Sequence, residues 1–157
     1  MESNHSQDGE PIQETVQTEG PIELTPSEAI LEQLVAEDTE YMFGIVGSGF
    51  MDILDIMPLS GITYVGVRHE NNGGHMADGY SQALRGEKPG VVIGQAGPGM
   101  TNFLTSMKTA KLNHSPIVMF SPTATTAGIG TGALQEADTM AIFDDATVWQ
   151  GRLEKND

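Results

Sequence analysis

Short apolar runs alternate with longer segments of helical periodicity from residue 25 to residue 120. The apolar runs, which we predict to be β-strands, are 41–46, 62–67, 90–94 and 116–120. Apolar residues recur at helical spacing in the segments that begin at residue 25 and in 50–57, 71–84 and 101–113. This alternation is typical of a parallel sheet with helices on both faces. The predicted fold class is therefore α/β with an open parallel sheet.

The first predicted helix has a well-defined start. Thr25 is the expected N-cap, Pro26 occupies the first helical position and Glu28 completes a capping box. The residues before it are polar and show no periodicity, so they cannot bury enough apolar surface to offset their ordering entropy. We therefore predict a disordered acidic leader over residues 1–23 and a single domain over residues 24–157.

Acidic side chains are concentrated in the first part of the chain. Residues 1–67 contain thirteen Asp and Glu and no Lys or Arg, whereas residues 68–157 contain nine acids and seven bases. An acidic leader on an ordinary domain explains this distribution, and adaptation to high salt explains it equally well. The total formal charge of −15 argues against nucleic-acid binding, which needs clustered Lys and Arg.

Other function classes are excluded by composition. The chain has no cysteine, which rules out a disulfide scaffold, a thiolate metal site and a cysteine nucleophile. No apolar run approaches the roughly 18–20 residues of a membrane-spanning helix. The first twenty residues lack the positive charge and apolar core of a signal peptide. We expect a cytoplasmic protein without a membrane partner.

Glycine-bearing turns follow three of the predicted strands: 47–49, the stretch after Arg68, and 97–99. In open parallel sheets, ligands bind beyond the carboxyl ends of the strands, so these turns should lie together. The first turn is not a dinucleotide fingerprint, because Asp52 stands where a third glycine is required. It is either a simple tight turn or a backbone surface that a ligand approaches closely.

Glu70 lies where the second strand gives way to a helix. Such an acid can merely complement the helix dipole, which is worth about 0.3–1 kcal/mol. A poorly hydrated carboxylate at this place would instead make a usable proton shuttle. The residue types alone leave both interpretations open. The neighbouring His69 and His75 are six positions apart and do not match the spacing of a zinc-binding helix, so no metal site is predicted.

The stretch 95–102 also has two interpretations. It is either a turn with Thr101 as the cap of the next helix, or a rigid wall, poor in side chains, against which a flat ligand packs. The sequence at this point does not decide between them.

Four ordered motifs resemble the N-terminal pyrimidine-binding domain of thiamine-diphosphate enzymes, broadly the acetolactate synthase group. They are Phe43-Gly44-Ile45-Val46-Gly47, Arg68-His69-Glu70, His75-Met76-Ala77-Asp78-Gly79-Tyr80 and Gly97-Pro98-Gly99-Met100-Thr101-Asn102. Further stretches at 93–95, at 107–110 with 113–114, and at 134–138 resemble the sulfoacetaldehyde acetyltransferase group within this family. The resemblance covers about residues 25–145.

The resemblance implies roles for individual residues. Glu70 would hydrogen-bond N1′ of the cofactor's aminopyrimidine and thereby promote removal of the thiazolium C2 proton. The pyrimidine ring would be lined by Val46, Gly47, Gly97, Pro98, Gly99 and Asn102. Gln135 would reach toward the substrate. The implied reaction converts sulfoacetaldehyde and phosphate into acetyl phosphate and sulfite.

The family's metal- and diphosphate-binding motif does not occur in this sequence. We therefore expect a pyrimidine-binding domain that is truncated at its C-terminus and works in a homo-oligomer or with a partner chain that carries the diphosphate and Mg²⁺ site. Two alternatives of function remain, an acetolactate synthase-like chain acting on pyruvate and a catalytically inactive fragment or binding module. A flavodoxin-like nucleotide-binding domain has only the fold class in its favour.

Overall fold

The computed structural model describes residues 23–153. The predicted leader, apart from Glu23, lies outside the described residues, as do the last four residues of the predicted domain. Among residues 23–153, none of the helices is long and apolar enough to cross a lipid bilayer.

Helices and strands alternate along the described chain, as predicted. The strands are β1 (Tyr41–Gly44), β2 (Thr63–Gly66), β3 (Gly90–Ile93) and β4 (Ile117–Phe120). The helices are α1 (Pro26–Ala36), α2 (Met51–Ser60), α3 (Glu70–Ala83), α4 (Pro98–Thr101), α5 (Leu104–Asn113) and α6 (Thr139–Phe143). Two 3₁₀ turns complete the list, η1 (Ser48–Phe50) and η2 (Thr126–Gly128).

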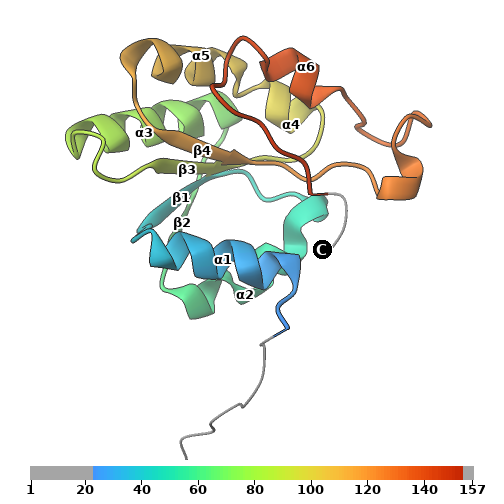
Figure 1. The fold of residues 1–157 in the computed structure, drawn as a ribbon, viewed down its shortest axis with the longest axis horizontal. Coiled ribbons are helices and arrows are strands. Elements are labelled where there is room, and N and C mark those ends of the chain that lie inside the picture. The colour runs from blue at the N-terminus through green and yellow to red at the C-terminus, as the bar shows by residue number, and fades with distance from the viewer. Residues whose placement is uncertain (1–22, 154–157) are drawn as a thin grey trace, which may run out of the picture.

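All strands of the sheet run parallel, in the order β2-β1-β3-β4. Figure 1 shows α1 and α2 on one face of the sheet and α3, α5 and α6 on the other. The predicted class, an α/β fold with an open parallel sheet covered on both faces, is confirmed.

The two-residue period of the strands distributes side chains between two cores. Met42 of β1 packs with α1 and α2, whereas its neighbour Phe43 packs on the side of α3 and α5. On β3, Val91 joins the first core and Val92 the second, and both are completely buried. Continuous apolar runs in β1 and β3 are thus explained by burial on both faces.

The capping box predicted for α1 is present. The Thr25 side chain accepts a hydrogen bond from the Glu28 N–H at 3.3 Å, and the Glu28 carboxylate accepts one from the Thr25 N–H at 2.7 Å. Both bonds satisfy amide groups that a helix start leaves without partners, so the helix begins where the sequence indicated.

Thr101 does not cap a helix, although capping was one of the two interpretations of residues 95–102. The helix starts three residues earlier, because Pro98 at the first turn has a backbone conformation suited to a helix start, and Gly97 is the N-cap. Thr101 ends α4 and its hydroxyl donates to the Pro98 carbonyl at 3.2 Å. The periodicity predicted over 101–113 corresponds to the end of α4 and to α5.

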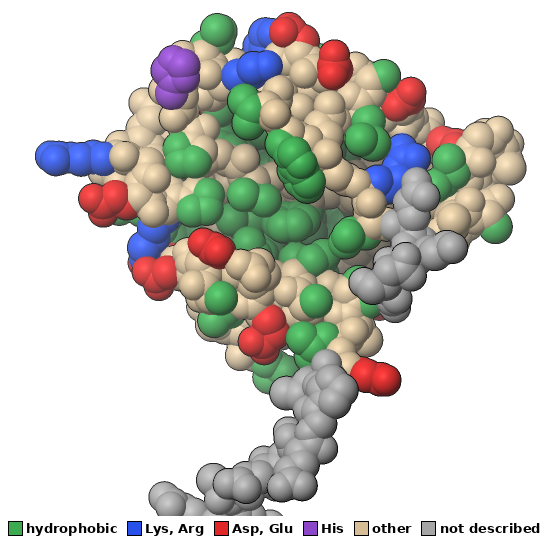
Figure 2. All heavy atoms as spheres, viewed as in Figure 1, with side chains coloured by type: hydrophobic (Ala, Val, Ile, Leu, Met, Phe, Trp, Pro, Cys, Tyr) green, Lys and Arg blue, Asp and Glu red, His purple; other side chains and the backbone are tan. Residues whose placement is uncertain are grey.

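The strand β2 lies at one edge of the sheet and is only partly buried. Thr63 and Gly66 are exposed, and the two residues between them are half-buried. The strand β4 forms the other edge within the described chain, and its Val118 is 38% exposed. Figure 2 shows apolar side chains at the surface between the two helical layers. Such an edge favours association with another chain or segment.

Candidate functional site

The turns that follow β1, β2 and β3 lie together, as predicted from the parallel order of the strands. The backbone N–H of Gly49, after β1, donates to Gln95 Oε1, after β3, at 3.1 Å. Asn102, also after β3, donates through Nδ2 to Glu70 Oε2, after β2, at 2.8 Å. Two hydrogen bonds therefore join three strand ends into one site.

Glu70 is the first residue of α3 and is half-buried. The preceding His69 caps the helix, with its Nδ1 accepting the Asn71 N–H at 3.2 Å. Asn71 in turn accepts the Ser106 N–H at 3.1 Å, which ties the start of α3 to α5. These contacts hold the Glu70 backbone in place, while Asn102 orients one oxygen of its carboxylate. The residues 23–153 contain no cluster of three or more His, Asp or Glu that could hold a metal ion.

The glycines of the turns let the backbone approach Glu70 and Gln95 closely. A methyl group at Gly99 would lie 3.4 Å from Glu70 Oε1 and 3.0 Å from the Cβ of Gln95. At Gly47 it would lie 2.3 Å from Gln95 Oε1. The result is a surface poor in side chains beside a carboxylate, which agrees with the second interpretation of residues 95–102, a wall poor in side chains.

Gly97 is the position at which backbone conformation decides the residue type. Its φ of 64° lies in the region that L-residues with a side chain rarely adopt. A Cβ there would also lie 2.3 Å from the carbonyl oxygen of Gln135. Gly97 therefore allows the segment containing Gln135 to pack directly on the turn after β3.

The segment 130–136 is organised around one carboxylate. Glu136 accepts hydrogen bonds from the backbone N–H groups of Gly130, Gly132 and Ala133, the last two at 2.8 and 3.0 Å. The Gly130 N–H is the main cause of a pKa for the Glu136 carboxyl below its ordinary value, with the other two amides adding to the effect and burial opposing it. These bonds hold Gln135 in a left-handed backbone conformation, with φ of 59°.

We expect this segment to loosen in acid. A carboxyl with a lowered folded-state pKa stabilises the fold at pH values above its ordinary pKa of 4.5, and that contribution is lost as the pH falls through the lowered folded-state pKa. The amide chemical shifts of Gly130, Gly132 and Ala133 should therefore titrate together below about pH 4.5. Glu136→Gln is the control, because its side chain does not ionise. An unchanged titration of these amides in that variant would show that another group is responsible.

A cavity of about 280 Å³ lies beside this segment, beyond the carboxyl ends of β3 and β4. Its lining includes Gly97, Gln135, Glu136 and Arg152, together with Ala96, Pro122, Thr123, Ala124, Ile129, Gly130, Ala137, Asp138 and Thr139. One cation, two carboxylates and the Gln135 amide thus line a cavity whose other residues are uncharged and mostly small. This is the place where a ligand is expected in an open parallel sheet.

The family model described as "Thiamine pyrophosphate enzyme, N-terminal TPP binding domain" matches residues 24–142. The chain belongs to the thiamine pyrophosphate enzyme family. The resemblance that the four ordered motifs indicated is thereby confirmed at the level of the family.

The chain is similar to two kinds of enzyme within this family. The chain is 44% identical over 135 residues to sulfoacetaldehyde acetyltransferase of Alcaligenes xylosoxydans xylosoxydans and, over the same length, to that of Castellaniella defragrans. It is 36% identical over 127 residues to the mitochondrial acetolactate synthase catalytic subunit of Saccharomyces cerevisiae. The matches cover 86% of this chain for the first two and 80% for the third. The chain spans only about a fifth of each relative's length, 22% or 18%.

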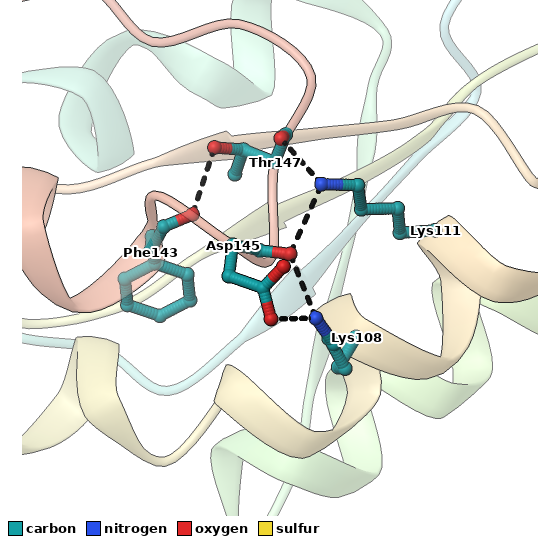
Figure 3. Close-up of polar contacts among 5 residues, drawn as sticks. All are labelled: Lys108, Lys111, Phe143, Asp145 and Thr147. Atoms are coloured by element: carbon teal, nitrogen blue, oxygen red, sulfur yellow. Dashed lines mark hydrogen bonds and ion pairs between the residues drawn. The ribbon is translucent and has the colours of Figure 1, made fainter.

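The last part of the family match, α6, is anchored by two lysines of α5 (Figure 3). Lys108 donates to the carbonyl and the carboxylate of Asp145, and Lys111 donates to the carbonyls of Asp145 and Thr147, each at 3.0 Å. Thr147 donates back to the Phe143 carbonyl at 2.9 Å. The Lys108 ammonium lowers the pKa of the Asp145 carboxyl. Neither α6 nor this anchor was predicted from the sequence.

Most of the predicted site residues meet at one place. Glu70, Gly99 and Asn102 form one group. Gly47 and Gln135 contact Gln95, and Gly97 packs against Gln135. Gly99 contacts both groups, since a Cβ there would touch Glu70 and Gln95. Val46 and Pro98 are exposed on the same turns, and Val46 is 58% exposed.

Sequence reasoning missed Gln95 as a site residue. One feature of the sequence could have indicated Gln95, because this polar residue follows a completely apolar strand at its carboxyl end, where ligands bind. Arg152 carried no such signal, since it lies in a segment without periodicity and reaches the cavity only through the fold.

Proposed function

We propose that this chain supplies the pyrimidine-binding half, and the cofactor-activating glutamate, of a thiamine-diphosphate-dependent acetyltransferase of the sulfoacetaldehyde acetyltransferase type. The reaction would convert sulfoacetaldehyde and phosphate into acetyl phosphate and sulfite. The observation that carries this proposal is the Glu70 carboxylate at the start of α3, held by Asn102 and facing the glycine turn after β3. The 44% identity to two such acetyltransferases supports the choice of substrate.

The residues fit the pyrimidine half of the cofactor. Within residues 23–153, Glu70 Oε1 has no hydrogen-bond partner, while Oε2 is bound by Asn102. A methyl group at Gly99 would sit 3.4 Å from Oε1, so glycine keeps the approach to that oxygen open. One free carboxylate oxygen beside a bare backbone surface suits a flat ring that offers a nitrogen.

When bound, thiamine diphosphate supplies a nucleophilic thiazolium carbon that attacks carbonyl groups. Glu70 would share a proton with N1′ of the pyrimidine through Oε1, with Asn102 preventing rotation of the carboxylate. The ring would rest on Val46, Gly47 and the turn Gly97-Pro98-Gly99. Gln135, which lines the cavity, would face the substrate.

The diphosphate and Mg²⁺ would be held elsewhere than in residues 23–153. A homo-oligomer, or a partner chain that carries a diphosphate-binding domain, would complete the site. The exposed edge strand β4 supports such an association. We place this complex in the cytoplasm as part of the same proposal.

The test is calorimetric titration of the full chain with thiamine diphosphate and Mg²⁺, alone and together with the part of the Castellaniella defragrans relative that this chain does not cover. We expect binding only in the presence of that partner, followed by formation of acetyl phosphate and sulfite from sulfoacetaldehyde and phosphate. An absence of cofactor binding in both mixtures would contradict the proposal and favour an inactive fragment or a binding module.

An acetolactate synthase-like activity is the second candidate. It is favoured by the 36% identity to the Saccharomyces cerevisiae catalytic subunit. The same reconstituted complex, supplied with pyruvate instead of sulfoacetaldehyde, decides between the two. Formation of acetolactate without formation of acetyl phosphate would select this second function.

A further inference from the structure

Gln95 is the side chain on which the turns of the site converge. It follows the buried strand β3, and its backbone carbonyl accepts the Met100 N–H at 2.9 Å at the start of α4. Its Oε1 lies 2.3 and 3.2 Å from the positions that Cβ atoms would take at Gly47 and Gly49. A side chain at Gly47 would displace the Gln95 amide. The absence of one lets Gln95 pack closely against this turn.

The hydrogen bonds of Gln95 have a fixed direction. The Gly49 backbone N–H only donates, so the Gln95 oxygen must face it, and that distance is 3.1 Å. The Gln95 Nε2 consequently points the other way and donates to Gln135 Oε1 at 2.9 Å. That bond turns the Gln135 oxygen toward Gln95, so the NH₂ group is the end of Gln135 that can face a ligand. Within residues 23–153, Gln135 Nε2 has no hydrogen-bond partner.

Gln135 cannot easily turn away from this arrangement. Its carbonyl oxygen packs on Gly97, where a Cβ would lie 2.3 Å away, and its backbone has a left-handed φ of 59°. The carboxylate of Glu136 holds three N–H groups of the same segment. The backbone of Gln135 is therefore fixed from both sides.

We propose that Gln95 is a positioning residue that orients the Gln135 amide so that its NH₂ group is available to an oxyanion of the substrate. This inference rests on the proposed function, because it takes the cavity lined by Gln135 as the substrate site. Gln135 then presents its two N–H donors to the ligand, while its oxygen is turned toward Gln95.

The cavity lining carries one cation and two carboxylates, so recognition of an oxyanion rests on the Gln135 NH₂ group rather than on net charge. Arg152 contributes a cation to the lining. The two carboxylates that also line it are occupied by the backbone, since Glu136 accepts three N–H groups and Asp138 accepts the Ala141 N–H at 3.1 Å. A sulfonate and a phosphate both offer several acceptor oxygens, so both match these donors.

NMR on the full chain without cofactor tests the direction of the hydrogen bond between Gln95 and Gln135. We expect the bonded NH₂ proton of Gln95 to exchange with solvent about tenfold more slowly than those of Gln135, as one hydrogen bond implies. In Gln95→Glu the introduced carboxylate only accepts, so Gln135 must rotate its amide and its NH₂ protons become protected. Gln33→Glu is the matched control, because it adds the same charge on the exposed surface of α1. Unchanged Gln135 protons in Gln95→Glu would overturn the proposal.

The ligand class is tested by titrating the same chain with isethionate, as a sulfonate, and separately with inorganic phosphate. We expect one or both to shift the Gln135 NH₂ resonance, and the responding probe identifies which oxyanion the donors serve. Gln135→Glu keeps an acceptor for Gln95 Nε2 but removes the donors, so it should weaken this binding about tenfold while the Gly49 amide is unperturbed. The proposal is overturned if neither probe shifts Gln135, or if the variant binds both as the wild type does.

These measurements fail independently of the proposed function. A chain that never binds thiamine diphosphate still reports the direction of the Gln95–Gln135 bond and its response to oxyanions. Conversely, an active complex in which Gln95→Glu leaves Gln135 unchanged would support the proposed function and contradict the positioning role of Gln95.

Discussion

Glu70→Gln should slow exchange of the thiamine diphosphate C2 proton by about 10²–10⁴-fold in the reconstituted complex, which is the range of a lost general acid–base group. The amide has the same shape and still accepts from Asn102, but it cannot share a proton with N1′. The loss of a favourable helix-dipole interaction alone would cost only about 0.3–1 kcal/mol of stability. The measurement is deuterium exchange at C2, followed by quenched NMR.

Glu28→Gln provides the matched control for this substitution. Glu28 is also an acid in the first turn of a helix, but its carboxylate serves the capping box of α1. We expect this variant to keep full exchange of the C2 proton. Full exchange in Glu70→Gln as well would assign Glu70 to the helix dipole and would falsify its role as proton shuttle.

Gly97→Ala should lower the free energy of unfolding by about 1–3 kcal/mol, the usual cost of one strained backbone position. Alanine disfavours the φ of 64°, and its Cβ would meet the Gln135 carbonyl oxygen at 2.3 Å. Because the neighbour is backbone, a side-chain rotation cannot relieve the contact. We also expect the Gln135 resonances to shift, since the segment 130–136 must move. Urea unfolding and NMR of the full chain measure both effects.

Gly79→Ala separates this effect from the general consequences of replacing glycine. Gly79 lies within α3, and a Cβ there meets no atom within 4 Å. Alanine is about 0.8–1.0 kcal/mol more favourable than glycine in a helix interior, so this variant should be more stable than the wild type. A Gly97→Ala chain as stable as Gly79→Ala would contradict the packing of Gln135 on the turn.

The order of the elements was predictable because it depends on local information. The capping box of α1 requires only the residues Thr25 to Glu28, and the apolar runs of β1 and β3 reflect burial on both faces of a parallel sheet. The parallel order then brings the strand ends together, so the meeting of Glu70 with the glycine turn followed from topology. The motifs at these ends also indicated the family, which the match over residues 24–142 confirmed.

Other features depended on contacts between residues far apart in the chain. The helix α6 was missed because its five residues are too few to show a periodic pattern. The residues that follow it, Asp145 and Thr147, are held by Lys108 and Lys111 of α5. The direction of the Gln95 amide has no signature in the sequence. It is decided by a backbone N–H 46 positions before it, through a bond that exists only once β1 and β3 are paired. By itself, the sequence thus determined the four strands, the main helices, the parallel direction of the strands and the family, because these follow from local pattern and from motifs. Only the tertiary structure decided which polar atoms at the strand ends are satisfied and which remain free for a ligand.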